Sequence, residues 1–253
     1  MTQPDATALV PLGPGDAFVF ACHAQAPCFN QCCRDLNQFL TPYDILRLKN
    51  HLGLSSRDFL DQYTTGHTGP QTGLPVVTLR TEGAKNFVCP FVSPEGCTVY
   101  ENRPGSCRTY PLVRLASRDR NTGKKTERYF VLTESHCQGF DSDKEWTAND
   151  WVRNQGLEPF NQFNDIFMEL IGLKAAAGPG PLDLKSQQVF RLACYDLDRF
   201  KERLEQGTLA ACEGMGEKVL SKVLADETQL LHLAIRWVAH VLFNAPLVLD
   251  PKG

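Results

Sequence analysis

The spacing of the cysteines constrains this chain more than any other feature. Eight of its ten cysteines fall within one region, at Cys22, Cys28, Cys32, Cys33, Cys89, Cys97, Cys107 and Cys137. A chain of 253 residues can bury an adequate core without covalent staples, so stability does not explain these thiols. The neighbours Cys32 and Cys33 cannot easily bridge to each other, because adjacent Cα atoms are too close for disulfide geometry. We therefore predict a metal site.

The intervals between these cysteines match neither common metal-binding pattern. They read C-x5-C-x3-C-C, then C-x7-C-x9-C, then Cys137 alone, without a C-x2-C knuckle. Zinc ribbons and fingers use short hairpins in pairs, and bacterial ferredoxins use C-x2-C-x2-C-x3-C-P. Thiolates suit zinc, iron and iron–sulfur clusters. The spacing leaves open one cluster with spare thiols or two four-coordinate sites.

Positive side chains near these thiols would offset their negative charge. Arg103 and Arg108 flank Cys107, and Tyr110 follows. We expect Arg103, Arg108 and Tyr110 to surround the metal centre; the alternative is that the arginines pair with surface carboxylates. Cys194, among apolar residues near the C-terminal end, is expected to be a small buried hydrophobe.

Charge and hydropathy exclude several classes of partner. The net charge is −3 and the pI about 6.1, which argues against nucleic acid and anionic membranes. The N-terminal segment lacks the basic and apolar regions of a secretory signal, so we expect a cytoplasmic protein. The most apolar stretch, 230–243, contains His232, Arg236 and His240 and reads as a buried amphipathic helix rather than a membrane span.

Local signals predict short strands before residue 142 and helices after it. Thr41 as cap and Gly53 as stop predict a helix over 42–52, and Ser55 is the expected cap of a helix over 56–63. We predict strands over 74–80 and 86–92, the second carrying Cys89. Residues 109–117 and 126–134 predict a β-hairpin, which would return Cys137 to Cys107. Three helical stretches follow, at 145–174, 183–206 and 217–243, with Thr147 as the first cap.

The expected fold class is α+β. We predict an N-terminal arm (1–20), an irregular cysteine-cluster metal-binding domain with short strands and a β-hairpin (21–141), and a helical region packed on it (142–253). These boundaries follow the change in sequence pattern near residue 142.

One joint motif carries a family resemblance. The string C-x2-Y-x2-R-P-x2-C-R-x-Y-P is formed by Cys97, Tyr100, Arg103, Pro104, Cys107, Arg108, Tyr110 and Pro111. With the preceding CPF and the C-x3-C-C run, it resembles the YkgJ-type cysteine-cluster family, a zinc- or iron-chelating domain also found in flagellin lysine N-methylases. The resemblance covers roughly residues 20–140. It implies a metal-binding domain and, for the methylase branch, an iron–sulfur cluster.

Three functions follow as hypotheses. The first is an iron–sulfur protein, with a 4Fe-4S type cluster in a structural or electron-transfer role. The second is a structural zinc protein that docks a protein partner. The third is an enzyme resembling a protein-lysine methyltransferase, against which the chain offers no glycine-rich strand-to-helix turn for a nucleotide-like cofactor. Whether the protein is an enzyme stays open, and no catalytic residue is predicted.

Overall fold

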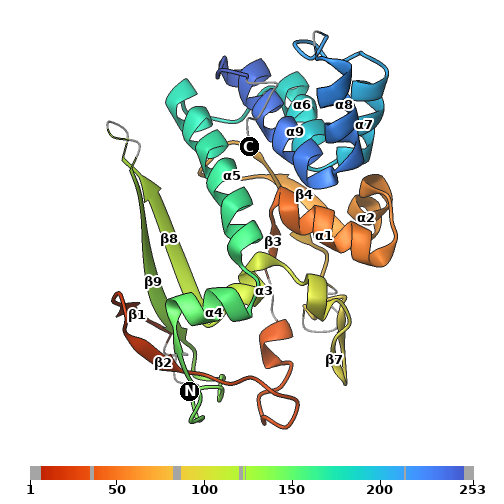
Figure 1. Ribbon diagram of the computed structural model, residues 1–253. Helices are drawn as coiled ribbons and strands as arrows, with labels where there is room; N and C mark the ends of the chain where they lie inside the picture. Colours follow the sequence, from red (N-terminus) through yellow and green to blue (C-terminus); the bar gives the residue numbers. More distant parts are fainter. Residues whose placement is uncertain are drawn as a thin grey trace. The chain divides into compact units, whose positions relative to one another are not determined.

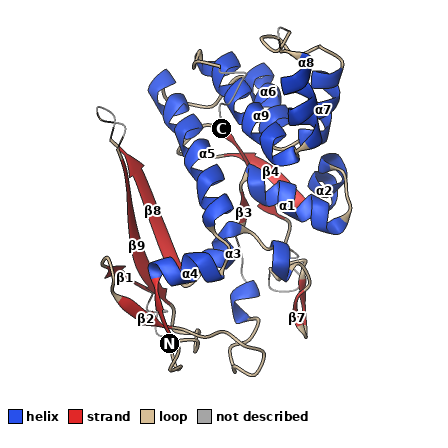
Figure 2. Cartoon of the chain, viewed as in Figure 1, coloured by secondary structure: helices blue, strands red, loops and turns tan. Residues whose placement is uncertain are grey.

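A computed structural model describes residues 7–34, 37–81, 87–119, 122, 124–213 and 215–247. The chain divides into two compact units. Unit 1 combines Met1–Leu36 with Thr81–Asn161, and unit 2 combines Asn37–Arg80 with Gln162–Gly253. Helices and short antiparallel strands make up both, which confirms the α+β class (Figures 1 and 2). The expected domain limits at residues 20 and 141 stay a prediction.

A three-stranded antiparallel sheet in unit 1 contains the expected hairpin. Its order is β1 (Ala8–Leu12), β9 (Lys125–Thr133) and β8 (Leu112–Arg118), with β9 in the centre. The hairpin strands β8 and β9 lie side by side in Figure 1. Leu112 pairs with Val131, and both are buried at the base of the hairpin. The expected return of Cys137 to Cys107 stays a prediction.

Aromatic side chains pack together in unit 1, next in the chain to a second, smaller sheet. Strand β2 (Ala17–Val19) pairs with β10 (Glu145–Thr147). Next to them, the ring of Phe20 lies 5.8 Å from Tyr110, 5.2 Å from Phe140 and 5.6 Å from Trp151, in edge-on contacts. Phe20, Tyr110 and Phe140 are two or three residues from Cys22, Cys107 and Cys137 respectively. The same aromatic core therefore anchors three cysteine-bearing segments.

Five short elements of unit 1 carry Cys32, Cys33, Cys97 and Cys107 or lie between them in the chain. They are the 3-10 turn Gln31–Cys33, the strands β6 (Val92–Ser93) and β7 (Gly96–Cys97), the 3-10 turn Tyr100–Asn102 and the helix α3 (Gly105–Thr109). The expected strand over 86–92 is wrong for its central part, because Cys89 lies in a turn closed by Val92 N to Cys89 O at 3.2 Å. Pro90 explains the difference, since it has no N–H to donate to a ladder. Asn86 lies outside the described residues.

The expected helical stretches are interrupted. Residues 145–147 are strand; helices α4 (Ala148–Asn154) and α5 (Glu158–Ala177) follow, with Thr147 confirmed as the cap of α4. Gly156, at φ +59°, separates them in the left-handed conformation that favours glycine. The later stretches divide into α6 (Leu184–Cys194), α7 (Leu197–Glu205), α8 (Glu217–Ala225) and α9 (Glu227–Phe243). Asp226 ends α8 and caps α9, because its carboxylate accepts from the amides of Thr228 and Gln229.

Unit 2 joins an early segment of the chain to these later helices. The early segment holds β3 (Phe39–Leu40), α1 (Pro42–Leu52), α2 (Ser56–Tyr63), β4 (Thr64–Thr68) and β5 (Pro75–Leu79), with sheet order β3-β5-β4. Thr41 caps α1, Ser55 caps α2, and Gly53 ends α1 at φ +66°, as predicted. Helix α9 is buried along one side against α6, α7 and α8, as expected for the stretch 230–243.

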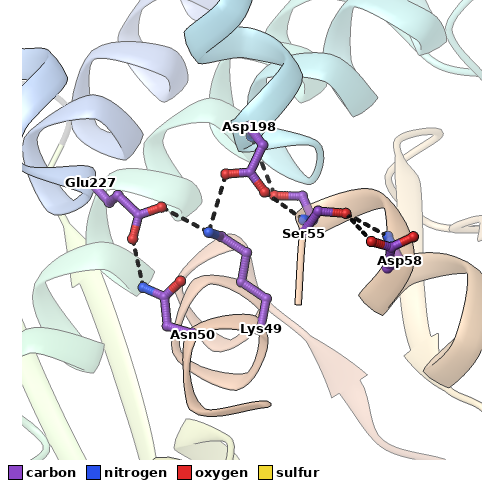
Figure 3. A network of polar contacts seen from close by, with 7 residues as sticks. Lys49, Asn50, Ser55, Asp58, Asp198 and Glu227 are labelled. Carbon is purple, nitrogen blue, oxygen red and sulfur yellow. Dashed lines mark hydrogen bonds and ion pairs between the residues drawn. The ribbon is translucent and has the colours of Figure 1, made fainter. Parts of the chain in front are cut away.

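An ion-pair network ties the two segments of unit 2 together (Figure 3). Lys49 Nζ on α1 lies 3.2 Å from Asp198 Oδ1 on α7 and 2.7 Å from Glu227 Oε1 on α9. Asn50 donates to the other oxygen of Glu227, at 2.6 Å. The Lys49 side chain is only 5 % exposed, and these carboxylates balance its buried positive charge. In the described part of the chain, no helix is both long and apolar enough to cross a membrane.

Candidate metal centre

The eight clustered cysteines all lie in unit 1, and the other two lie in unit 2. None of the ten is joined in a disulfide bond. Cys194 is 1 % exposed in unit 2, which confirms its prediction as a buried hydrophobe, and Cys212 is buried as well. Cys22, Cys32 and Cys107 are exposed, whereas the other five clustered thiols are half-buried. Unit 1 thus concentrates the accessible thiols of the chain.

One group of thiols gathers around the loop that follows the hairpin. The amide of Gln138 donates to Cys28 Sγ at 3.2 Å, and the amide of Ala21 donates to Gly139 O at 2.8 Å. These bonds bring Cys22 and Cys28 to the loop of Cys137. Burial raises the pKa of Cys22 to about 11, and the thiols of Cys32, Cys28 and Cys137 add to the shift in that order. Such mutual effects require thiols that are near one another.

A second group gathers around the β6–β7 hairpin. The amide of Cys89 donates to Cys33 O at 2.9 Å, and Cys97 pairs with Val92 across the hairpin. Burial raises the pKa of Cys89, and the nearby thiols of Cys97 and Cys32 raise it further. Cys107, on α3, is among the thiols that raise the pKa of Cys33. Cys33, Cys89, Cys97 and Cys107 therefore share one neighbourhood.

Cys32 and Cys33 connect the two groups. A hydrogen bond between their side chains lowers the pKa of Cys32 to about 7 and raises that of Cys33. The turn that carries them follows Asn30, which has φ +66° and donates from Nδ2 to Ser93 O at 2.9 Å. Asparagine tolerates this left-handed conformation well. Asn30 therefore fixes the cysteine turn against β6, a role that we did not predict from the sequence.

The two predicted arginines are buried, each 8 % exposed, so surface carboxylate pairs do not describe them. Arg103 donates to Tyr100 O at 2.6 Å and to the side chain of Gln155, and its guanidinium stacks 3.8 Å from the Tyr100 ring. Burial raises the pKa of Cys97, while the charge of Arg103 opposes that rise. Arg103 is therefore close enough to act electrostatically on the thiols.

The guanidinium of Arg108 donates hydrogen bonds to backbone carbonyl oxygens. It donates to Arg103 O at 3.2 Å, to Gln155 O at 2.8 Å and to Glu101 O. Its guanidinium also lies 5.0 Å from the Phe160 ring. These contacts fix the 101–103 loop against the end of α4. No sequence signal marked Gln155 as the common partner of Arg103 and Arg108.

Tyr110 places a buried hydroxyl next to this cluster. Among the described residues no group makes a hydrogen bond of acceptable geometry with its Oη. Burial raises the pKa of Tyr110, and the neighbouring Cys137 thiol and Glu134 carboxylate raise it further. A buried hydroxyl without a partner is costly, so its position beside Cys137 suits a donor for a charged sulfur.

The donor set fits a thiophilic metal, although the coordination shell is not closed. Among the residues that the structure describes, no three Cys, His, Asp or Glu side chains are arranged to hold a metal ion as they stand. Eight thiols outside any disulfide nevertheless share unit 1, with Arg103 to offset their charge and the Tyr110 hydroxyl beside Cys137 as a donor for a sulfur. Metal sites of this kind commonly close only when the metal binds.

Comparison with protein families agrees with this chemistry. A family model named CxxCxxCC, "Putative zinc- or iron-chelating domain", matches residues 21–144. The match includes all eight clustered cysteines and excludes Cys194 and Cys212. Neither the comparison with curated proteins nor that with solved structures found a match. The expectation of a cysteine-cluster, metal-chelating domain is confirmed.

Proposed function

Because residues 21–144 belong to the CxxCxxCC family of zinc- or iron-chelating domains, we propose that unit 1 binds an iron–sulfur cluster of the 4Fe-4S type. Its role would be structural or electron transfer. The observation that carries the proposal is the gathering of eight cysteines, none of them in a disulfide, from separate segments into one unit. Clusters use cysteines brought together in this way from distant parts of a chain. The half-buried surroundings of five of these thiols would limit solvent access to a cluster.

The proposed ligands are drawn from Cys22, Cys28, Cys32, Cys33, Cys89, Cys97, Cys107 and Cys137. Arg103 would offset the negative charge of bound thiolates, and the Tyr110 hydroxyl would donate to the Cys137 sulfur. Arg108 would hold the 101–103 loop in place for both. Hydrogen bonds to cluster sulfurs shift reduction potentials, so these neighbours would tune the centre. Free thiols also suit a reducing compartment, which supports a cytoplasmic location.

Structural zinc is the second candidate. The all-thiolate donor set suits tetrahedral zinc as well as a cluster. The open arrangement of the thiols favours a site that forms with the metal, which is the usual behaviour of structural zinc domains. In this case unit 1 would serve as a metal-ordered platform for a protein partner.

The test is elemental analysis of protein purified without air. Iron and acid-labile sulfide in equal amounts, with broad visible absorption, would support the iron–sulfur cluster. Stoichiometric zinc in a colourless protein would contradict the cluster and support structural zinc. Cys107→Ala should lose metal, whereas the matched control Cys194→Ala should keep it. Wild-type protein without bound metal, even after reconstitution with iron and sulfide or with zinc, would contradict both candidates.

A further inference from the structure

The sheet β1-β9-β8 of unit 1 has a packed face and an open face. Residues that pair across neighbouring strands lie on the same face, so the register assigns each side chain to one of the two. Leu112 and Val131 define the packed face, where they are only 3 % and 7 % exposed. None of the paired residues on the opposite, open face is buried. A sheet packed on one side normally carries polar side chains on the other.

The open face is instead apolar over most of its length. Its apolar residues are Leu9, Pro11, Val113, Leu115, Phe130 and Leu132. Leu9 and Leu115 are each 56 % exposed. Leu115 belongs to the outer part of the hairpin, which β1 does not reach because it pairs only with residues 129–133 (Figure 1). A continuous exposed apolar surface drawn from three strands is typical of a site that binds another macromolecule.

The charges of the sheet are divided between its two faces. Among the paired residues of the open face only Arg128, opposite Leu115, is charged. In the part of the chain that the structure describes, the Arg128 guanidinium makes no hydrogen bond or ion pair. The carboxylate of Glu127 lies on the packed face, where it pairs with Arg114 and Lys125. The open face therefore combines apolar surface with one unpaired positive charge.

We propose that the open face docks an acidic segment of another protein, meaning an apolar segment that carries at least one Asp or Glu. Its apolar side chains cover Leu115 and Phe130, and its carboxylate binds Arg128, whose planar guanidinium suits a carboxylate. A second copy of this chain is a poorer occupant, because its open face would bring another arginine and no carboxylate. This docking does not depend on the proposed metal binding.

Photo-cross-linking tests the docking surface in cells that produce the protein naturally. A benzophenone amino acid replaces Leu115 on the open face of the full-length chain. In the control it replaces Ala116, which lies on the packed face. Mass spectrometry identifies the linked peptide. Position 115 should cross-link an apolar peptide of another protein that contains Asp or Glu, and position 116 should not cross-link it.

The charge requirement is tested with that peptide, synthesised and titrated against the purified full-length chain. Arg128→Glu should raise the Kd about tenfold or more, because like charges would then face each other. Arg118→Glu makes the same change in net charge on the packed face and should change the Kd by less than about twofold. Leu115→Ser should also weaken binding, since it removes apolar contact surface. Both Leu115 and Arg128 are exposed, so these variants should fold.

Several results would overturn the acidic partner. They are no protein cross-linked from position 115, a linked peptide without a carboxylate, or a linked peptide from a second copy of this chain. Equal losses of affinity in Arg128→Glu and Arg118→Glu would overturn it too, because the effect would then follow net charge rather than the open face. Metal content should be the same in wild type, Leu115→Ser and Arg128→Glu, so failure of the docking proposal is distinguishable from failure of metal binding.

Discussion

The backbone amide of Gln138 donates a hydrogen bond to the sulfur of Cys28 across 3.2 Å, although 110 residues separate the two positions. The β8–β9 hairpin brings the chain to Gln138 shortly before this contact, and the early cysteine segment supplies Cys28. This bond therefore holds Cys28 against the loop that carries Cys137.

Tyr110→Phe tests whether the buried hydroxyl is kept for the metal-bound state. In metal-free protein the free energy of unfolding should change by less than about 0.5 kcal/mol, because the hydroxyl has no described partner to lose and the ring contact with Phe20 remains. In metal-loaded protein the substitution should shift the reduction potential of a cluster, or the zinc affinity, since a donor to sulfur is removed. Urea unfolding and a redox or metal titration measure the two effects. If metal-loaded wild type and Tyr110→Phe had the same reduction potential or zinc affinity, the hydroxyl would not be a donor to a metal-bound sulfur.

Lys49→Met should destabilise unit 2 without affecting metal content. The substitution leaves the carboxylates of Asp198 and Glu227 without their cation, and these are each 34 % exposed. Breaking a buried pair costs several kcal/mol, and partial exposure reduces this to about 2 kcal/mol. Arg57→Ala is the matched control, because its pair with Asp61 is 81 % and 73 % exposed and should cost less than about 0.5 kcal/mol. The free energies of unfolding are measured by chemical denaturation. Similar losses of stability in Lys49→Met and Arg57→Ala would mean that the Lys49 ion pairs do not stabilise unit 2.

Glu127 should make the stability of unit 1 depend on acid pH. A hydrogen bond from Arg114, with help from Lys125, lowers the pKa of Glu127 from 4.5 to about 2 in the folded protein. A lowered folded pKa stabilises the protein above pH 4.5, and this stabilisation disappears as the pH falls towards 2. Because the side chain is 33 % exposed, we expect only about 1 kcal/mol. The unfolding free energies of wild type and Glu127→Gln should converge over this range; a constant difference would refute the assignment.

Thiol labelling should separate the clustered cysteines from the buried pair. In native protein stripped of metal, iodoacetamide should modify the exposed Cys22, Cys32 and Cys107, whereas Cys194 and Cys212 should react only after unfolding. In metal-loaded protein the clustered thiols that bind the metal should be protected. Peptide mass mapping before and after chelation distinguishes these states. Labelling of Cys194 as fast as Cys32 would contradict the division of the ten cysteines.

Local signals predicted the fold best where one residue determines the backbone. Thr41, Ser55 and Thr147 cap the helices that they were expected to cap, and Gly53 ends α1. The break between α8 and α9 at Asp226 was missed, because apolar residues recur at helical spacing both before and after it. The union of residues 37–80 with the later helices in unit 2 depends on contacts such as Lys49 with Asp198, which no local pattern reports.

The site was predictable in composition but not in arrangement. The motif spacing and the family resemblance marked the eight thiols, and the family match includes all of them. Their division around Gln138 and the β6–β7 hairpin depends on long-range backbone hydrogen bonds, which the spacing leaves undetermined. The supporting positions Asn30 and Gln155 were missed for the same reason, since each acts on residues distant in sequence.

The most direct test of the central claim is X-ray absorption at the edge of the metal that the purified protein contains. The account predicts a first shell made only of sulfur, at about 2.3 Å for zinc or for iron bound by thiolate and sulfide. Iron in a cluster should also show a second shell of iron neighbours. A first shell of nitrogen and oxygen would contradict the account, because the clustered thiols would then not hold the metal.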